Sequence, residues 1–465
     1  MRNKSLVLWG ALVTAVACTG GNDSSDDDDS AGSGGSGATG GTGTGGVDRP
    51  PPPPEGSAIS DRLTVTEVTV PEGVKEGANS WRVWGRGDLE VAPVYTAPRA
   101  DCSNLVCYTT GSGDAITARV TLLGPDGALV ESYELEAGRE CRGLAAAPDG
   151  SFAALLWDDA SDAIYVHRYD VDGSELGVTQ LVNADNNPDD FGLGESRLEY
   201  GDGRYGAYYH VHSDSGHEGD TLKWVDAASG DESTEWGWGC SHSMSNLLRY
   251  NPGIATFLPV CVTDCYPGTS GSDFESDSIG GIYLDHDEGK VMDVDGGCNG
   301  SVAAELGSAA PAPNGYKLVF NAHQDAATPG QSSYDESTMN QDIGFASVTP
   351  SWSSDPVVWL TSTADVNEAD ASIERWLPSD DPTEQYLVGW LEPPATYWLA
   401  RVDATGAWLE EPTDVSDQVA WGHRDDPFRA DAGGDIVWAW FDDAGSTTLH
   451  FARIGTGMAA VCTPF

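Results

Sequence analysis

Two stretches in the middle of the chain combine histidines with carboxylates and aromatic rings. They contain His210, His212, His217, Glu218 and Asp220, then Trp236, Trp238 and His242, with Asp264 further along. His210 and His212 are two residues apart on an expected strand, so their side chains share one face. Neutral imidazoles and carboxylates can hold zinc or another transition metal, and the favoured ligand set is His212, His217 and His242. A divalent metal is therefore a candidate cofactor. The alternative is that these histidines are hydrogen-bonded loop anchors near a central channel, because no known metal motif such as H-E-x-x-H fits the spacing.

The aromatic residues suggest a second kind of site, since the chain has 16 Trp and 16 Tyr. Several flank polar loops, and flat rings beside Asp, Asn and His are typical of sugar recognition. The further residues expected to contact such a ligand are Tyr266, His323, Asp325, Trp421, His423, Arg424 and Asp425. Strand aromatics are instead expected to pack between sheets, namely Trp157, Trp390, Trp438 and Trp440.

The sequence shows no recognisable nucleophilic machinery. It contains no G-x-S-x-G elbow, and Ser241-His242-Ser243 is a local neighbourhood rather than a triad. A carboxylate pair for glycoside cleavage cannot be chosen from 74 acidic residues without geometry. Asp-rich pieces such as Asp170–Gly173 lack calcium-loop spacing and are expected to be turns. No catalytic residue is therefore assigned.

A loosely repeated unit of roughly fifty to sixty residues must position these groups. In one copy, Phe152–Trp157 leads to an acidic turn, and a second run, Tyr165–Tyr169, ends in an Asp–Gly turn. Apolar residues alternate or run continuously, which predicts strands and no convincing helix. Such a period in an all-β chain of this length resembles a β-propeller.

Taking four strands per blade, we expect seven blades, with six or eight as alternatives. Second strands are expected near 104–110, 151–157, 204–212, 254–262, 315–323, 385–391 and 435–441, and third strands near 115–122, 163–169, 219–226, 279–285, 342–349, 395–403 and 446–454. The run Leu63–Val70 is expected to pair with the last blade, which closes the ring and removes open edges. Val461-Cys462 is the alternative closing piece.

The loops of such a fold sort onto two faces. Loops between second and third strands share a face with the connections between blades. The long ones lie at 212–220, 263–278 and 323–342, with connections at 236–246, 361–371 and 416–427, and they carry most of the nine histidines. The opposite face is expected to carry mainly short Asp–Gly hairpins. We therefore expect the functional site on the loop-rich face, around blades 3 to 7.

The N-terminus resembles the leader of a bacterial lipoprotein. Arg2 and Lys4 precede an apolar run that is too short to span a bilayer. Ala15-Val16-Ala17-Cys18 is similar to a lipobox, although Leu usually stands where Ala15 is. The resemblance implies a signal peptide over 1–17 and a lipidated Cys18; cleavage near Ala17 with an incidental Cys18 is the alternative. Residues 18–57 are rich in Gly, Ser, Asp and Pro, so we expect a disordered tether before a propeller domain at 58–465.

Charge and cysteine content narrow the class of protein further. The formal net charge of −51 argues against nucleic acid and against electrostatic docking to anionic lipid, so the membrane is reached only through the anchor. An even number of cysteines in an exported chain predicts disulfides. The candidates are Cys102, Cys107, Cys141, Cys240, Cys261, Cys265, Cys298 and Cys462. Cys102/Cys107 and Cys261/Cys265 are near enough for local pairs, and Cys462 is placed to tie the closing blade.

These observations favour a monomeric, surface-tethered binding module in the bacterial envelope, at the outer membrane or cell surface. It would recognise a glycan or a protein through the loop-rich face. A first alternative is an exported metal-assisted hydrolase or lyase acting on polysaccharide. A second is a structural envelope lipoprotein without a small ligand.

Overall fold

The computed structural model describes residues 57–77, 91–113, 115–158, 160–161, 163–181, 196–212, 218–240, 243–264, 280–286, 288–295, 302–325, 340–377, 383–422, 426–458, 462–463 and 465. All of them belong to one unit, Val47–Phe465. No helix among them is long and apolar enough to cross a membrane.

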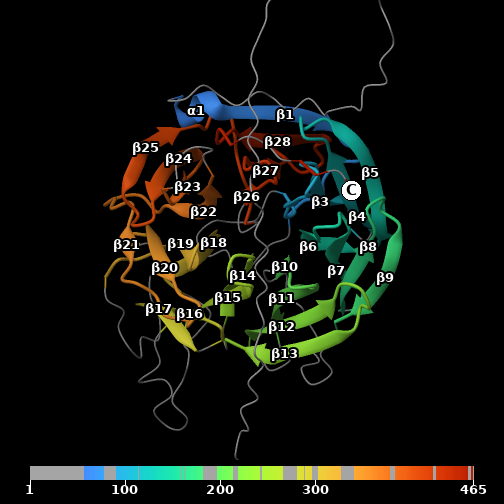
Figure 1. Ribbon diagram of the computed structural model, residues 1–465, viewed down its shortest axis with the longest axis horizontal. Helices are drawn as coiled ribbons and strands as arrows, with labels where there is room; N and C mark the ends of the chain where they lie inside the picture. The colour runs from blue at the N-terminus through green and yellow to red at the C-terminus, as the bar shows by residue number, and fades with distance from the viewer. Residues whose placement is uncertain are drawn as a thin grey trace, which may run out of the picture. The chain divides into compact units, whose positions relative to one another are not determined.

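The described strands form seven four-stranded antiparallel sheets arranged as the blades of a β-propeller (Figure 1). Blades 1 to 3 are β2 (Tyr95–Pro98), β3 (Asn104–Ser112), β4 (Ala115–Leu123), β5 (Leu129–Ala137); β6 (Glu140–Ala146), β7 (Phe152–Asp158), β8 (Ala163–Tyr169), β9 (Glu175–Gln180); and β10 (Ser196–Gly201), β11 (Arg204–His212), β12 (Glu218–Asp226), β13 (Glu232–Gly239). Blades 4 and 5 are β14 (Ser243–Asn251), β15 (Thr256–Thr263), β16 (Gly280–Leu284), β17 (Gly289–Val294); and β18 (Ala304–Ala312), β19 (Gly315–Ala322), β20 (Asp342–Val348), β21 (Val358–Trp359). Blade 6 is β22 (Ala369–Trp376), β23 (Gln385–Glu392), β24 (Thr396–Asp403), β25 (Trp408–Asp414), and blade 7 is β26 (Arg429–Ala430), β27 (Ile436–Trp440), β28 (Thr448–Ile454) with β1 (Leu63–Thr69).

The all-β fold and the seven blades are confirmed, and the expected second and third strands lie close to where the sequence pattern put them. The second strand of blade 3 has the expected bounds, 204–212, and that of blade 4 begins two residues later than expected, at Thr256. The described residues include a single turn of helix, α1 (Ile59–Arg62), directly before β1.

The ring is closed by the N-terminal strand, as the sequence predicted. β1 pairs antiparallel with β28 in continuous register, from Leu63 opposite Ile454 to Thr69 opposite Thr448. Figure 1 shows the blue β1 lying outside the red β28. Val68 is buried against the core of the last blade, whereas Val65 on the same strand is exposed. The last blade is therefore completed by residues from opposite ends of the chain.

Short Asp–Gly turns join third to fourth strands, as expected. In blade 2, the Gly173 amide donates to the Asp170 carbonyl, and the Asp170 carboxylate accepts from the Ser174 amide. Gly173 has φ 83°, a conformation that glycine adopts at no steric cost. These pieces are turns rather than calcium loops.

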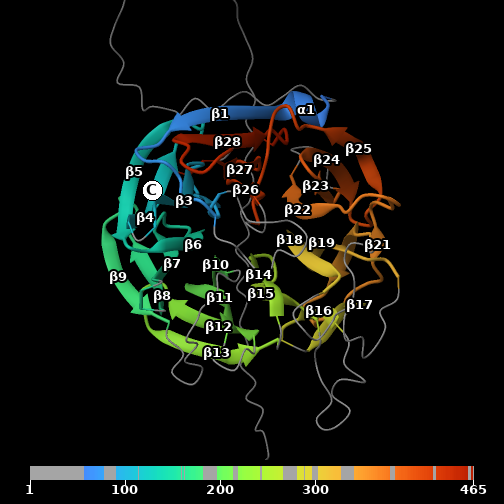
Figure 2. The ribbon, with the colours of Figure 1, turned by 180° about the vertical axis from the view of Figure 1, so that it is seen from behind.

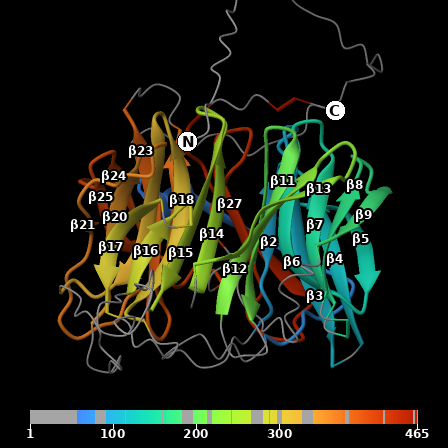
Figure 3. The same ribbon diagram turned by 90° about the horizontal axis from the view of Figure 1, so that it is seen from below.

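The blades pack face to face through large apolar side chains. Trp157, Trp390, Trp438 and Trp440 are all buried between sheets, which confirms their expected packing role. Seen from the other side, the first strands of the blades surround the axis of the ring (Figure 2). The edge-on view shows the strands running roughly along that axis (Figure 3). These innermost strands are β2, β6, β10, β14, β18, β22 and β26.

Among the described residues three disulfides are formed, and their pairing corrects the expected local pairs. Cys102 bonds Cys462 and Cys107 bonds Cys141, rather than each other. Cys261 bonds Cys240 rather than Cys265. The reason is that the folded sheets bring distant cysteines together: Cys107 on β3 meets Cys141 on β6 of the next blade. Cys462 ties the C-terminal tail to the turn between β2 and β3, while Cys265 and Cys298 lie outside the described residues.

Candidate functional site

Arginines are concentrated on the innermost strands. Five of these strands carry one each: Arg142 on β6, Arg197 on β10, Arg249 on β14, Arg375 on β22 and Arg429 on β26. The whole chain has only 23 Lys and Arg residues against 74 acids. Because the innermost strands border the axis, arginines from separate blades can meet there, and Arg249 and Arg429 do so around Glu199.

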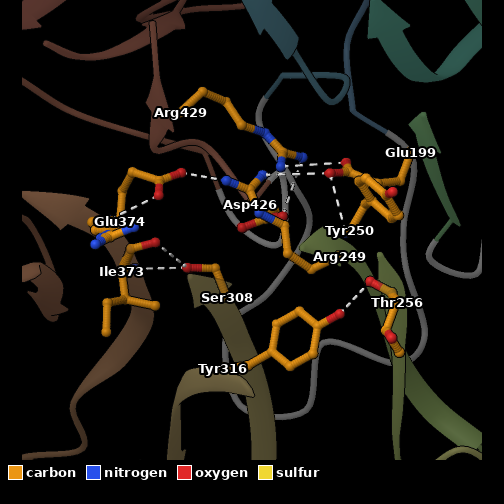
Figure 4. Close-up of polar contacts among 11 residues, drawn as sticks. Glu199, Arg249, Tyr250, Thr256, Ser308, Tyr316, Ile373, Glu374, Asp426 and Arg429 are labelled. Carbon is orange, nitrogen blue, oxygen red and sulfur yellow. Dashed lines mark hydrogen bonds and ion pairs between the residues drawn. The ribbon is translucent and has the colours of Figure 1, made fainter. Parts of the chain in front are cut away.

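Arg249 is at the centre of an ion network that crosses this channel (Figure 4). Its buried guanidinium donates to the Glu374 carboxylate, from a strand two blades away. On the other side it lies 3.9 Å (Nη1 to Oε1) from Glu199 on blade 3. The Glu199 Oε1 also accepts from the Tyr250 amide at 3.3 Å. One guanidinium thus links blades 3, 4 and 6.

Arg429 extends the network to blade 7. Its Nη1 lies 3.4 Å from Oε2 of Glu199, and its Nη2 lies 3.1 Å from Oδ2 of Asp426. Asp426 is 2 % exposed, and neither of its carboxylate oxygens has a hydrogen-bond partner of good geometry. Its charge is thus compensated by ion pairing rather than by hydrogen bonds.

Burial raises the pKa of all three carboxyls in this network. The pKa values of Glu199 and Glu374 are raised by desolvation, which the nearby Arg249 opposes. The pKa of Asp426 is raised to about 7 by desolvation, against the opposing effect of Arg249 and Arg197. Removing a carboxylate from water disfavours its charged form, and ion pairing restores only part of that cost. Burial thus disfavours the ionised form of Asp426 more than Arg249 and Arg197 favour it.

A pocket of about 400 Å³ opens beside this network. It is lined by residues from all seven innermost strands, among them Glu199, Arg249, Glu374, Arg375 and Arg429. The partly buried residues Tyr200 and Tyr250 also line it, as do several prolines. Its volume falls in the range of small-molecule sites, and it combines rings, guanidiniums and carboxylates.

The pocket lies at one identifiable end of the channel. Asn251, Pro252 and Gly253 line it from the turn between β14 and β15, and Pro313 lines it from the turn between β18 and β19. Turns from first to second strands belong to the face of short hairpins, not to the loop-rich face. The arrangement can hold a polar ligand by its hydrogen-bonding groups, with a ring beside it.

Among the described residues that the sequence predicted for the site, Asp220 has a pKa that its surroundings clearly raise. Its buried carboxylate accepts from the Tyr208 hydroxyl at 2.5 Å and from the Trp236 indole at 3.0 Å. Desolvation raises its pKa to about 6. The Trp236 ring also meets His286 edge-on at 5.6 Å. The structure thus brings Asp220 and Trp236 together, and the two side chains are hydrogen-bonded to each other.

Of the other predicted residues that the structure describes, His210 lies directly opposite Asp220 in the ladder between β11 and β12. His210 and Asp264 are buried. His323 and the exposed Asp325 form a loose pair, with 3.8 Å between Nε2 and Oδ2. Trp421 is 3 % exposed and packs against Phe428 and Trp438, so its ring is part of the core between blades 6 and 7.

The remaining predicted residues cannot be placed. His217, His242, Tyr266, His423, Arg424 and Asp425 lie outside the described residues, as do the side chains of His212, Glu218 and Trp238. The expected metal set of His212, His217 and His242 thus stays a prediction. Within the described part of the chain, Asp220, Cys240 and Cys261 place potential ligand atoms within 4.8 Å of one another. The two sulfurs form a disulfide, however, so they are not thiolate ligands there.

Sequence reasoning missed the channel network. A signal for it exists, because the segment before most second strands contains an arginine with an acid close by, as in Arg197-Leu198-Glu199 and Glu374-Arg375. Aligning the repeats on their first strands would have exposed this recurrence. The histidines, in contrast, are gathered mainly in the long loops.

No family model and no curated protein matches the sequence. Among solved structures, the chain is similar to the β-propeller domain of the Trilobed protease from Pyrococcus furiosus, with 12 % identity, a TM-score of 0.42, and coverage of 75 % of this chain and 91 % of that one. It is similar to AofleA from Arthrobotrys oligospora, with 11 % identity, a TM-score of 0.39, and coverage of 76 % and 90 %. It is also similar to the sialidase of Trypanosoma rangeli in complex with the inhibitor DANA, with 9 % identity, a TM-score of 0.37, and coverage of 84 % and 60 %. Values this low carry no argument about ligand or activity.

Proposed function

We propose that the protein is an extracytoplasmic binding module that takes a glycan into the pocket at the hairpin end of its channel. The observation that supports this is the pocket of about 400 Å³, in which two Tyr rings adjoin fixed charges from several blades. Sugars offer apolar faces to rings and hydroxyls to charged or polar groups. The loop-rich face is a separate candidate surface. Much of it lies outside the described residues.

Binding is tested with the full chain against a panel of neutral and acidic oligosaccharides by isothermal titration calorimetry. Tyr200→Ala removes a pocket ring and is expected to weaken binding about tenfold, the upper range of an aromatic contact. Tyr165→Ala is the matched control, since Tyr165 is also a partly buried strand ring in an edge-on aromatic pair but lies outside the pocket. Equal losses in both variants, or binding of proteins but no glycan, would reject the proposal.

We also propose that the protein lies in a bacterial envelope. A lipid on Cys18 would anchor it there, and residues 18–57 would form the tether. It is supported by the apolar leader and by Ala15-Val16-Ala17-Cys18. Cys18→Ala is expected to move the protein from the membrane fraction to the soluble fraction and to abolish labelling by a clickable fatty acid. Unchanged fractionation and labelling would contradict the anchor.

An exported hydrolase or lyase acting on polysaccharide is a second candidate. It is favoured by two pocket carboxyls, Glu199 and Glu374, whose pKa values are raised by burial, as in many acid–base pairs. The test is release of reducing ends or unsaturated sugars from bound polysaccharide over hours, with and without chelator. Stable binding without product supports the binding module and removes the enzyme.

A further inference from the structure

Guanidiniums and carboxylates from several blades adjoin the pocket. Arg249, Arg375 and Arg429 line it together with Glu199 and Glu374, and Asp426 pairs with Arg429 beside it.

The three carboxylates are already engaged. Glu374 pairs with Arg249, and Asp426 pairs with Arg429. Glu199 lies between Arg249 and Arg429, at 3.9 and 3.4 Å. A cationic ligand would have to displace one of these arginines, so the network itself disfavours it.

Arg375 is the pocket guanidinium that stands outside this pairing. Within the described part of the chain, the ion pairs of the network involve Arg249 and Arg429, and none involves Arg375. The residue lines the pocket and is partly exposed. Its backbone amide donates to Glu374, which fixes its position on β22 beside the network. A planar guanidinium that is held on a strand and has no carboxylate partner among the described residues is suited to bind one bidentately.

We infer that the pocket selects glycans that carry a carboxylate, that is, uronic acids, and that Arg375 pairs with this group. The inference rests on the proposed glycan-binding function and specifies its ligand class. The sugar ring lies against Tyr200 and Tyr250, which line the same pocket, while its carboxylate faces the guanidinium of Arg375. Neutral sugars keep the ring contact and lose the ion pair.

The test compares trigalacturonate with its carboxyl-reduced, neutral form by calorimetry on the full chain. The uronate is expected to bind at least tenfold more tightly. Arg375→Gln is expected to reduce uronate affinity to that of the neutral form and to leave neutral binding unchanged. Arg375→Lys, which keeps the charge but loses the planar fork, is expected to recover only part of the affinity.

Arg401→Gln serves as the control, because Arg401 is also a partly exposed strand arginine but pairs with Glu410 at 3.0 Å outside the pocket. Its uronate affinity is expected to equal that of the wild type. Thermal melting checks that Arg375→Gln folds normally. Equal binding of the uronate and the neutral form, or an unaffected Arg375→Gln variant, would overturn the inference while leaving glycan binding intact. Absence of binding to every glycan tested would instead reject the underlying proposal and the inference with it.

Discussion

At the scale of single residues, the channel is defined by carboxyls that are buried more deeply than their charge favours. Glu199 and Glu374 are held by arginines from other blades, and Asp426 is held by Arg429, three positions further along the chain. Such pairs contribute little net stability, because desolvation offsets their attraction. These ion pairs instead fix the positions of the side chains, because a guanidinium that contacts two carboxylates holds both of them beside the pocket. Burying the charged residues that line the pocket therefore lowers the free energy of unfolding.

The free-energy cost of burying Asp426 depends on pH. Its folded pKa of about 7 lies above the ordinary value of 3.8, so between these pH values the folded state holds a proton that the unfolded state releases. Its contribution to stability is therefore greatest in acid and is lost as pH rises through 7. Asp426→Asn is expected to raise the free energy of unfolding at pH 8 by roughly 1–3 kcal/mol and by less than half as much at pH 5, which lies only about one pH unit above the unfolded pKa.

Urea titrations at both pH values measure this difference. The exposed Asp355→Asn is the control and is expected to change neither titration. Asp220 and Glu368, whose pKa values are raised to about 6 and about 7 mainly by burial, act in the same direction. A stability that rises from pH 5 to pH 8 in the wild type would contradict the assignment.

At the scale of elements, the ring depends on one strand from the N-terminal end. β1 supplies the outer edge of the last blade and reaches its core through Val68. Val68→Asp places an unpaired carboxylate in that core and is expected to cost more than about 3 kcal/mol of unfolding free energy. Val65→Asp, on the exposed positions of the same strand, is expected to cost little. Denaturation with guanidinium chloride measures the loss of unfolding free energy in both variants. Equal losses would argue against closure through β1.

The Cys102–Cys462 disulfide is the second closing element. It joins residues separated by 360 positions, so it constrains nearly the whole folded chain. A cross-link over so long a loop is expected to stabilise by about 2–5 kcal/mol. The double variant Cys102→Ser, Cys462→Ser should lose that amount in urea titration. A midpoint equal to that of the wild type would show that β1 closes the ring unaided.

At the scale of the whole molecule, the acidic excess opposes compactness. Self-repulsion at a formal net charge of −51 is screened by salt, since the Debye length falls from about 30 Å at 0.01 M to about 3 Å at 1 M. The melting temperature is therefore expected to rise by several degrees over this range in sodium chloride. Scanning calorimetry measures it, and a fall would mean that the channel ion pairs outweigh the surface repulsion.

The sequence by itself determined the architecture. Alternating apolar runs, Asp–Gly turns and a recurring period predicted seven four-stranded blades and the closing strand Leu63–Val70, because these signals are local and repeat along the chain. It also predicted that Trp438 and its counterparts pack between sheets. Only the tertiary structure decided which residues share the channel. Arg249 meets Glu374, 125 positions away, and Arg429 meets Glu199, 230 positions away. Ring closure brings such residues together, and so it also decides which cysteines pair and places Trp421 in the core. Local pattern specifies a blade, but the contacts across the axis exist only once all seven blades are in place.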